Sequence, residues 1–200
     1  MNLRNHVTTA AVIAAFGAAL PTVAAAQAGS GITWPHQSGF WGHLGASVGT
    51  ADLDSACPAG ATCDNTEQLF RIYGGGRFNN IFGGEVGFIK FGNFKRGDGR
   101  TDAKGVDFTL LAGVPFGTNK NWSVFGKLGT LYSDTDVNGT TPGLQTGDET
   151  GWGTRVGLGL QAGITENWAV RADLDRWRIK LPGGRDNIDT LMVGAQYTFR

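Results

Sequence analysis

Hydrophobic and polar residues alternate with a period of two along most of the chain beyond the first 38 residues. In one such segment Val106, Phe108 and Leu110 share one face, while Asp107 and Thr109 share the other. Strict alternation indicates a half-buried β-strand, because an amphipathic helix repeats every 3.6 residues. The pattern predicts eight strands, near residues 40–50, 68–78, 81–92, 105–116, 122–132, 152–162, 168–178 and 188–199.

The connections between these strands alternate in length. Long polar segments lie at 51–66, 93–104, 133–149 and 180–187, and short joins lie at 79–80, 117–121 and 163–167. Strands of about ten residues can cross a bilayer when tilted, and an even number of strands is typical of closed bacterial barrels. The predicted fold is therefore all-β, an eight-stranded antiparallel up-and-down transmembrane β-barrel, with its short turns and both ends of the mature chain in the periplasm.

Residue size and aromatic positions indicate which face of this barrel meets lipid. A soluble eight-stranded barrel would show the same alternation inside out. Here the polar face is rich in glycine, which suits a crowded interior. Trp122 and Trp168 stand at strand ends, as do Tyr197 and Phe199, where an interfacial aromatic girdle is expected.

Lys90 falls on the apolar face of the third strand, which predicts a β-bulge or an early exit from the apolar zone.

Composition supports strands and excludes two protein classes. The 200 residues include 33 glycines, more than twice the usual share, and glycine weakens helix interiors. An all-α fold is therefore excluded. Lys and Arg number 17, equal to Asp and Glu, so the chain lacks the basic excess of a nucleic-acid-binding protein.

The N-terminus has the features of a secretory signal peptide. Arg4 supplies the positive charge, residues 10–20 form an apolar stretch, and three alanines at 24–26 provide a cleavage site. The predicted organisation is a signal peptide at 1–26, a periplasmic N-terminal segment at 27–38 and an outer-membrane barrel domain at 39–200.

Cys57 and Cys63 are the only two cysteines. Export to an oxidising compartment favours a small disulfide loop between them. A metal site is the competing interpretation, but two thiols without further His or Cys nearby fall short of four ligands.

Short motifs occur in a fixed order along residues 39–200: FWG at 40–42, GASVG at 45–49, GGRF at 75–78, EVGF at 85–88, GKLG at 126–129, GWG at 151–153 and YTF at 197–199. In this order they resemble the small outer-membrane β-barrels typified by the transmembrane domain of outer membrane protein A. The resemblance implies location in the outer membrane, contact with outer-membrane lipid and lipopolysaccharide, and insertion by the barrel-assembly machinery through the C-terminal strand.

The chain departs from that family in two respects. Arg200 follows the aromatic residue that usually ends the assembly signal. The peptidoglycan-binding domain of the larger members is absent, so the resemblance does not imply wall anchoring. A closed barrel has no free edge that demands a partner, which predicts a monomer.

Charged residues of both signs fall on the face predicted to line the interior. Buried charges persist only when they are paired. Two interpretations of these interior charges are open. The resemblance implies a conduction path that is gated or very narrow, and the alternative is a plug of paired charges that fills the barrel. We favour the plug, because side chains can just fill an eight-stranded barrel. The eight residues are Arg71, Glu85, Asp107, Lys127, Arg155, Arg171, Asp173 and Asp175.

Catalysis finds little support. Some small outer-membrane barrels modify lipid A, which would need a nucleophile and a base within hydrogen-bond reach on the lipid-facing side. His43 and Ser47 lie four residues apart on one strand, about 13 Å by strand rise, and both face the interior. His36 precedes the barrel and has no visible partner. We therefore expect no enzyme activity and no cofactor.

The segment 134–139 matches the opening of an EF-hand calcium loop, with Asp134, Asp136 and Asn138 at ligand positions. Position twelve is Gln145 in place of the bidentate carboxylate, and strands flank the segment where an EF-hand has helices. The match therefore indicates an acidic extracellular loop and only a weak calcium candidate.

The sequence thus predicts an outer-membrane barrel with a structural or surface-interaction role, in envelope integrity or adhesion. Four extracellular loops would bind a host or surface ligand. A low-conductance pore and a lipid A-modifying enzyme are the alternatives.

Overall fold

The computed structural model describes residues 41–54, 63–79, 81–117, 121–140, 145–182 and 184–199. The predicted signal peptide and the segment 27–38 lie outside these residues. The described elements are the strands β1 (Trp41–Leu53), β2 (Cys63–Asp64), β3 (Thr66–Arg77), β4 (Phe82–Arg96), β5 (Gly99–Phe116), β6 (Trp122–Asn138), β7 (Gly147–Gly163), β8 (Trp168–Leu181) and β9 (Gly184–Thr198). Among the described residues, no helix is long and apolar enough to cross a membrane.

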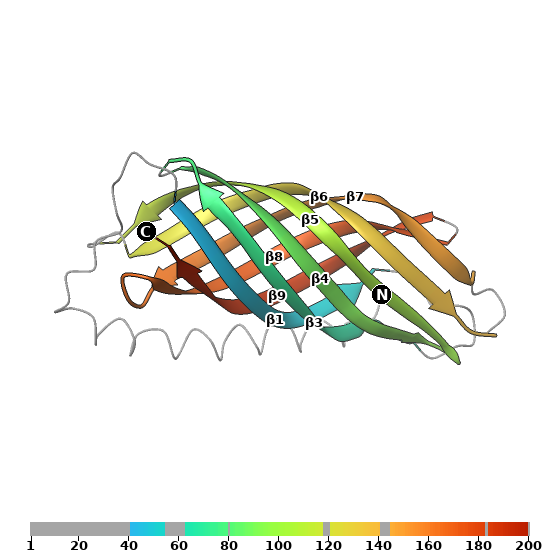
Figure 1. Cartoon of the computed structure of the whole chain (residues 1–200). Coiled ribbons are helices and arrows are strands. Elements are labelled where there is room, and N and C mark those ends of the chain that lie inside the picture. Colours follow the sequence, from blue (N-terminus) through green and yellow to red (C-terminus); the bar gives the residue numbers. More distant parts are fainter. Residues whose placement is uncertain are drawn as a thin grey trace. The chain divides into compact units, whose positions relative to one another are not determined.

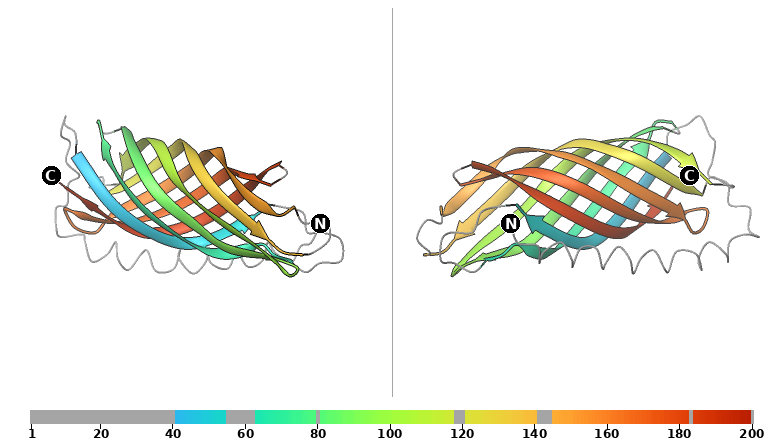
Figure 2. Two further views of the ribbon diagram at one scale, coloured as in Figure 1. Left: turned by 45° about the vertical axis from the view of Figure 1, so that its right-hand side comes forward. Right: turned by 180° about the vertical axis from the view of Figure 1, so that it is seen from behind.

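The eight long strands close into an antiparallel barrel (Figures 1 and 2). Each pairs with its neighbour in the sequence, and β1 also pairs with β9, so no long strand has a free edge. The two-residue β2 pairs with the far end of β4. The predicted eight-stranded up-and-down barrel is confirmed.

The two ends of the barrel differ in their connections. Short turns join β3 to β4, β5 to β6 and β7 to β8, as predicted, and we call this the turn-side end. In the last of these turns, the Thr165 hydroxyl accepts hydrogen bonds from the backbone N–H groups of Asn167 and Trp168. We call the opposite end the loop-side end. It holds the connections that follow β1, β4, β6 and β8.

The predicted long loops at 93–104, 133–149 and 180–187 were largely wrong, because the strands continue through them. A tight turn at Gly97 and Asp98 joins β4 to β5, β6 runs on to Asn138, and only residues 182–183 separate β8 from β9. Charged residues in these segments suggested loops, but a strand whose outer face meets water also carries charges.

An irregularity interrupts β4 where Lys90 was expected to cause one. The register with β5 shifts between Lys90 and Asn93, and Gly92 adopts a φ of 85°. Glycine takes up this left-handed conformation without steric cost. The predicted bulge is confirmed.

The turn-side half of the barrel is apolar outside and polar inside. On β5, for example, Val106, Phe108 and Leu110 are exposed, whereas Asp107 and Thr109 are buried. The apolar outer residues of β5 continue to Phe116, which corresponds to a band of roughly 25 Å for a strand tilted by about 40°. That height matches the hydrocarbon region of an outer membrane.

The loop-side half has the opposite arrangement. Its interior is a hydrophobic cluster of Ala51, Leu53, Leu69, Ile89, Phe91, Phe94, Ala103, Leu131, Val137, Trp177, Ile179, Leu181, Ile188 and Met192. Its outer face carries charged side chains, including Lys90, Asp102, Lys104, Asp134, Asp136, Asp148, Arg176, Arg178 and Asp189. This half has the polarity of a protein in water.

Candidate functional site: a ring of buried charges

The strand period brings the predicted interior charges together. On β8, Arg171, Asp173 and Asp175 are two residues apart and therefore point to the same side. The other five reach the interior from β3, β4, β5, β6 and β7. All eight side chains are buried.

These eight residues form a closed ring in which the sign of the charge alternates. Each residue pairs with the next in the order Glu85, Arg71, Asp107, Arg155, Asp175, Lys127, Asp173 and Arg171. Arg171 then pairs with Glu85 and closes the ring. Four positive and four negative groups balance. Each ion therefore has an oppositely charged neighbour on both sides, which offsets the loss of its hydration.

Bidentate contacts fix the geometry of this ring. Arg71 donates from Nε and Nη2 to the two carboxylate oxygens of Asp107, at 3.0 and 2.8 Å. Arg155 bridges two acids, with Nη1 2.7 Å from Asp107 Oδ1 and Nη2 2.7 Å from Asp175 Oδ2. Lys127 Nζ likewise lies 2.8 Å from Asp173 Oδ1 and 2.6 Å from Asp175 Oδ1.

Aromatic rings lie on both sides of the charged ring. The Arg171 guanidinium lies 4.8 Å from the centroid of Tyr73 and 4.6 Å from that of Phe125, both toward the turn-side end. Arg155 lies 4.1 Å from the centroid of Trp177, which begins the hydrophobic cluster on the loop side. Cation–π contacts add to the ion pairs and restrict the guanidinium groups further.

Glycines supply the room for these side chains. A Cβ at Gly157 would lie 1.9 Å from Asp175 Oδ1, and a Cβ at Gly87 would lie 2.5 Å from Asp107 Oδ2 and 2.8 Å from Arg71. The ring therefore depends on the absence of a side chain at these two positions.

The histidine and serine considered for catalysis both lie inside the barrel. His43 Nε2 lies 3.1 Å from Glu85 Oε1, and the Ser47 hydroxyl lies 3.9 Å from the sulfur of Met192. Within the described part of the chain, no hydrogen bond joins the two. His36 is outside the described residues.

The predicted interfacial aromatics gather at the turn-side end. Trp168 packs edge-on against Tyr197, with centroids 5.1 Å apart, and Tyr197 packs in the same way against Phe199. Trp122 contacts Phe116 across the turn between β5 and β6. These rings border the apolar band.

The calcium candidate does not lie in a loop. Asp134, Asp136 and Asn138 belong to β6, where they face outward in register with β5 and β7, and Asp134 pairs with Lys104 at 3.3 Å. A continuous strand does not curl around an ion as an EF-hand loop does. No group of three or more candidate ligands that could hold a metal occurs in the described ranges.

The predicted disulfide stays a prediction. Cys63 begins β2, but Cys57 lies outside the described residues.

Sequence reasoning missed the contribution of His43 and of the aromatic rings to the charged site. Tyr73 follows Arg71 by two residues and Trp177 follows Asp175 by two, so both rings share the inward face of their strands. This parity was the signal that could have identified them.

A family model described as the outer membrane protein β-barrel domain matches residues 10–199. Among solved structures, Neisserial surface protein A is similar with a TM-score of 0.60 and 17% identity, over 79% of this chain and 97% of that chain. The N-terminal β-barrel domain of Pseudomonas aeruginosa OprF has a TM-score of 0.50 and 14% identity, over 79% and 97% of the two chains. Ail of Yersinia pestis has a TM-score of 0.49 and 22% identity, over 82% and 100%. No curated protein sequence matches the chain.

Proposed function

Because the chain belongs to the outer membrane protein β-barrel domain family, we propose that it is a non-conducting outer-membrane barrel whose loop-side end forms an interaction surface outside the cell. The observation that carries the proposal is the closed ring of eight alternating charges, held between aromatic rings and backed by a hydrophobic cluster.

The ring supports a closed interior because ion passage would have to disturb it. Each carboxylate contacts two cations, and a passing ion would need to separate at least one such pair. Breaking a buried pair costs about 3–5 kcal/mol. On the loop side, a passing ion would then meet the hydrophobic cluster, where a charge finds no partner.

The outer face supports the orientation and the surface role. The short turns would face the periplasm, so the charged loop-side walls and connections would stand outside the cell. The walls present paired strands with charged side chains to a host or surface ligand. The apolar band would contact outer-membrane lipid and lipopolysaccharide, the last strand would direct insertion by the assembly machinery, and the closed barrel would act as a monomer.

Single-channel recording in a planar bilayer tests the closed interior. We would insert the protein purified from outer membranes, with insertion confirmed by heat-dependent gel mobility. We expect no reproducible current steps from the parent. Steps that change in size with Arg171→Ala or Glu85→Ala would overturn the proposal and favour the low-conductance pore.

Shortening of the loop-side walls tests the surface role. Replacing residues 135–149, the outer part of the β6–β7 hairpin, by a two-residue Asn-Gly turn between the paired Asp134 and Thr150 should abolish adhesion of expressing cells to a host-cell surface while the barrel still assembles. Equal adhesion by both strains would contradict a surface role for this hairpin.

An enzymatic role has the weaker support. His43 contacts Glu85 and Ser47 contacts Met192, and both point to the interior, away from lipid. Unchanged lipid A in cells that overproduce the protein is the expected result.

A further inference from the structure

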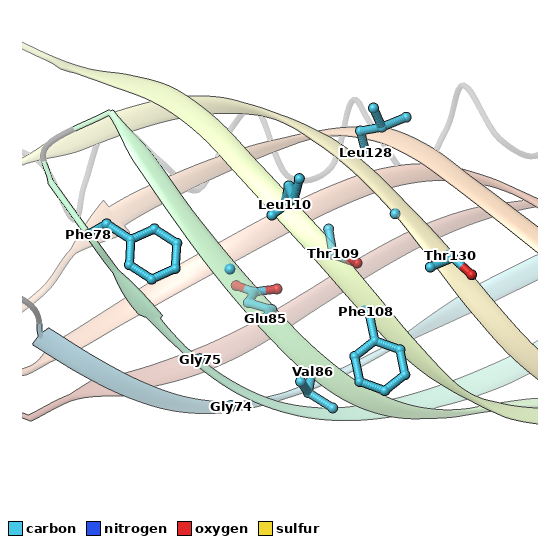
Figure 3. A pocket seen from close by; sticks show the side chains of 12 residues that line it. Gly74, Gly75, Phe78, Glu85, Val86, Phe108, Thr109, Leu110, Leu128 and Thr130 are labelled. Carbon is cyan, nitrogen blue, oxygen red and sulfur yellow. The ribbon is translucent and has the colours of Figure 1, made fainter.

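A hollow of about 520 Å³ lies on the outer wall of the barrel, across β3, β4, β5 and β6 (Figure 3). Large apolar side chains surround it: Phe78, Val86, Phe108, Leu110 and Leu128. These residues belong to the apolar band, so the hollow opens toward the hydrocarbon region of the membrane.

The hollow exists because two outward positions carry no side chain. Gly74 and Gly84 occupy outward positions on adjacent strands, where most neighbouring outward residues are large. A Cβ at Gly84 would meet its nearest atoms at 3.8 Å, so backbone crowding does not require glycine there. Glycines of the interior, by contrast, are required by close contacts. The space at Gly84 is therefore available to a molecule outside the barrel.

Two lysines stand at the loop-side border of the band, on β4 and β5, the strands that contribute Val86 and Phe108 to the hollow. Lys90 and Lys104 face each other directly across β4 and β5. Lys90 lies 4.0 Å from Asp102 and Lys104 lies 3.3 Å from Asp134, all with exposed side chains. Exposed pairs of this kind are weak, so each ammonium group can still bind a phosphate.

We propose that the hollow and this lysine pair form one binding site for lipopolysaccharide, with an acyl chain in the hollow and a lipid A phosphate on Lys90 and Lys104. Along β5, Lys104 precedes Phe108 by four residues, about 13 Å. A saturated acyl chain of ordinary length spans that distance from headgroup to hollow. Lipopolysaccharide is chosen over phospholipid because the loop-side border faces outward in the proposed orientation.

The site rests on that orientation but does not require a closed interior. Current through the barrel and lipid retention are separate measurements, so failure of one proposal leaves the other distinguishable.

Native mass spectrometry of the full chain, extracted in mild detergent from the outer membranes of expressing cells, tests the site. The parent should retain one lipid A-containing molecule. Gly84→Leu fills the hollow and should lower the retained fraction roughly tenfold, equivalent to about 1.4 kcal/mol. Gly126→Leu is the matched control, because Gly126 is also outward, a Cβ there would meet only Ala112 O, at 3.8 Å, and Gly126 does not line the hollow.

A second pair of variants tests the phosphate contact. Lys90→Gln combined with Lys104→Gln should remove the preference for phosphorylated over dephosphorylated lipid A added to the purified protein. The control variant, Arg176→Gln combined with Arg178→Gln on the outer face of β8, should retain the preference for phosphorylated lipid A.

Three results would overturn the proposal. They are equal retention by the parent and Gly84→Leu, equal retention of lipid A and phosphatidylethanolamine by the parent, and no retention by a parent shown to be folded by heat-dependent mobility. Heat-dependent mobility of every variant separates loss of the site from loss of the fold.

Discussion

The two halves of the barrel are built from the same strands with opposite polarity. On β8, Arg171 and Asp173 point inward and Leu174 points outward in the turn-side half. Four residues further on, Arg178 points outward and Ile179 inward. The polarity of each face changes over two residues. The outer face changes from apolar Leu174 to charged Arg176, and the inner face changes from charged Asp175 to aromatic Trp177.

The medium around the barrel explains this exchange. Where lipid surrounds the wall, apolar side chains belong outside, and the charges that remain inside must pair with one another. Where water surrounds the wall, apolar side chains are buried and charges are hydrated. The difference shows that the sidedness of a strand depends on its surroundings as well as on its alternation.

The largest expected effect comes from a comparison of two arginines on β8. Arg171→Ala leaves Glu85 and Asp173 buried with a cation missing, and should lower the free energy of unfolding by about 3–5 kcal/mol. Arg176 also makes a bidentate contact, with both oxygens of Asp189 at 2.6 Å, but this pair is exposed to water. Arg176→Ala should therefore have little measurable effect. Urea unfolding in phospholipid vesicles, followed by tryptophan fluorescence, measures both, and equal losses would contradict the comparison.

The loop-side interior should respond to loss of volume. Ile179 is fully buried in the hydrophobic cluster, and Ile179→Ala should destabilise the barrel by about 2–5 kcal/mol. The neighbouring Arg178→Ala, on the outer face of the same strand, is the control. Protease resistance of the loop-side hairpins and urea unfolding would detect the change, and a wild-type result for Ile179→Ala would show that this interior is not tightly packed.

A charge on the outer face should distinguish the halves. Leu110 is 65% exposed at mid-height of the apolar band, and Leu110→Arg should cost about 2–4 kcal/mol. Asp136→Arg, on the outer face of the loop-side half, should cost nothing comparable. Refolding yield and unfolding in vesicles provide the measurement, and a similar penalty at both positions would contradict the assignment of lipid and water.

The smallest effect concerns a carboxyl beyond the apolar band. Burial raises the pKa of Asp52, and the carboxylates of Asp189, Asp54 and Asp64 raise it further, against a hydrogen bond from Thr66. A carboxyl with a raised pKa binds its proton more tightly in the folded chain, so its contribution to stability is present at low pH and is lost as pH rises through the folded pKa.

Asp52→Asn removes this ionisation. At neutral pH the variant should be more stable than the parent, because folding makes the Asp52 carboxyl harder to ionise. The gain should be only a few tenths of a kcal/mol, because the side chain is only partly buried and water screens the neighbouring charges. The difference should vanish below the ordinary pKa of aspartate. Unfolding measured across pH checks this, and a variant less stable at neutral pH would contradict it.

The sequence predicted the closed barrel, its short turns and the bulge near Lys90, because these follow from local alternation and turn residues. It also identified the eight inward charges by parity. The order of the ring could not be predicted, since the contact of Glu85 on β4 with Arg171 on β8 depends on closure of the barrel across strands far apart in the sequence.

The outer halves of the strands were missed for a related reason. In residues 99–104 the alternation continues, but charged residues now take the outward positions that apolar residues take from Val106 onward. Because charged residues were taken to indicate loops, each strand was predicted to end at the edge of the apolar band. The lipid-facing hollow was missed because Gly74 and Gly84 look like other strand glycines until their neighbours are placed.

Depth measurement along the outer face of β5 tests the central claim most directly. A spin label attached through an unnatural amino acid at Asp102, Lys104, Phe108 or Leu110 would report collision with oxygen, which concentrates in lipid, and with a water-soluble nickel complex. The account predicts nickel accessibility at Asp102 and Lys104 and oxygen accessibility at Phe108 and Leu110, with the change between Lys104 and Phe108. Oxygen accessibility that continues through Lys104 to Asp102 would contradict it, because the charged wall would then lie in the membrane.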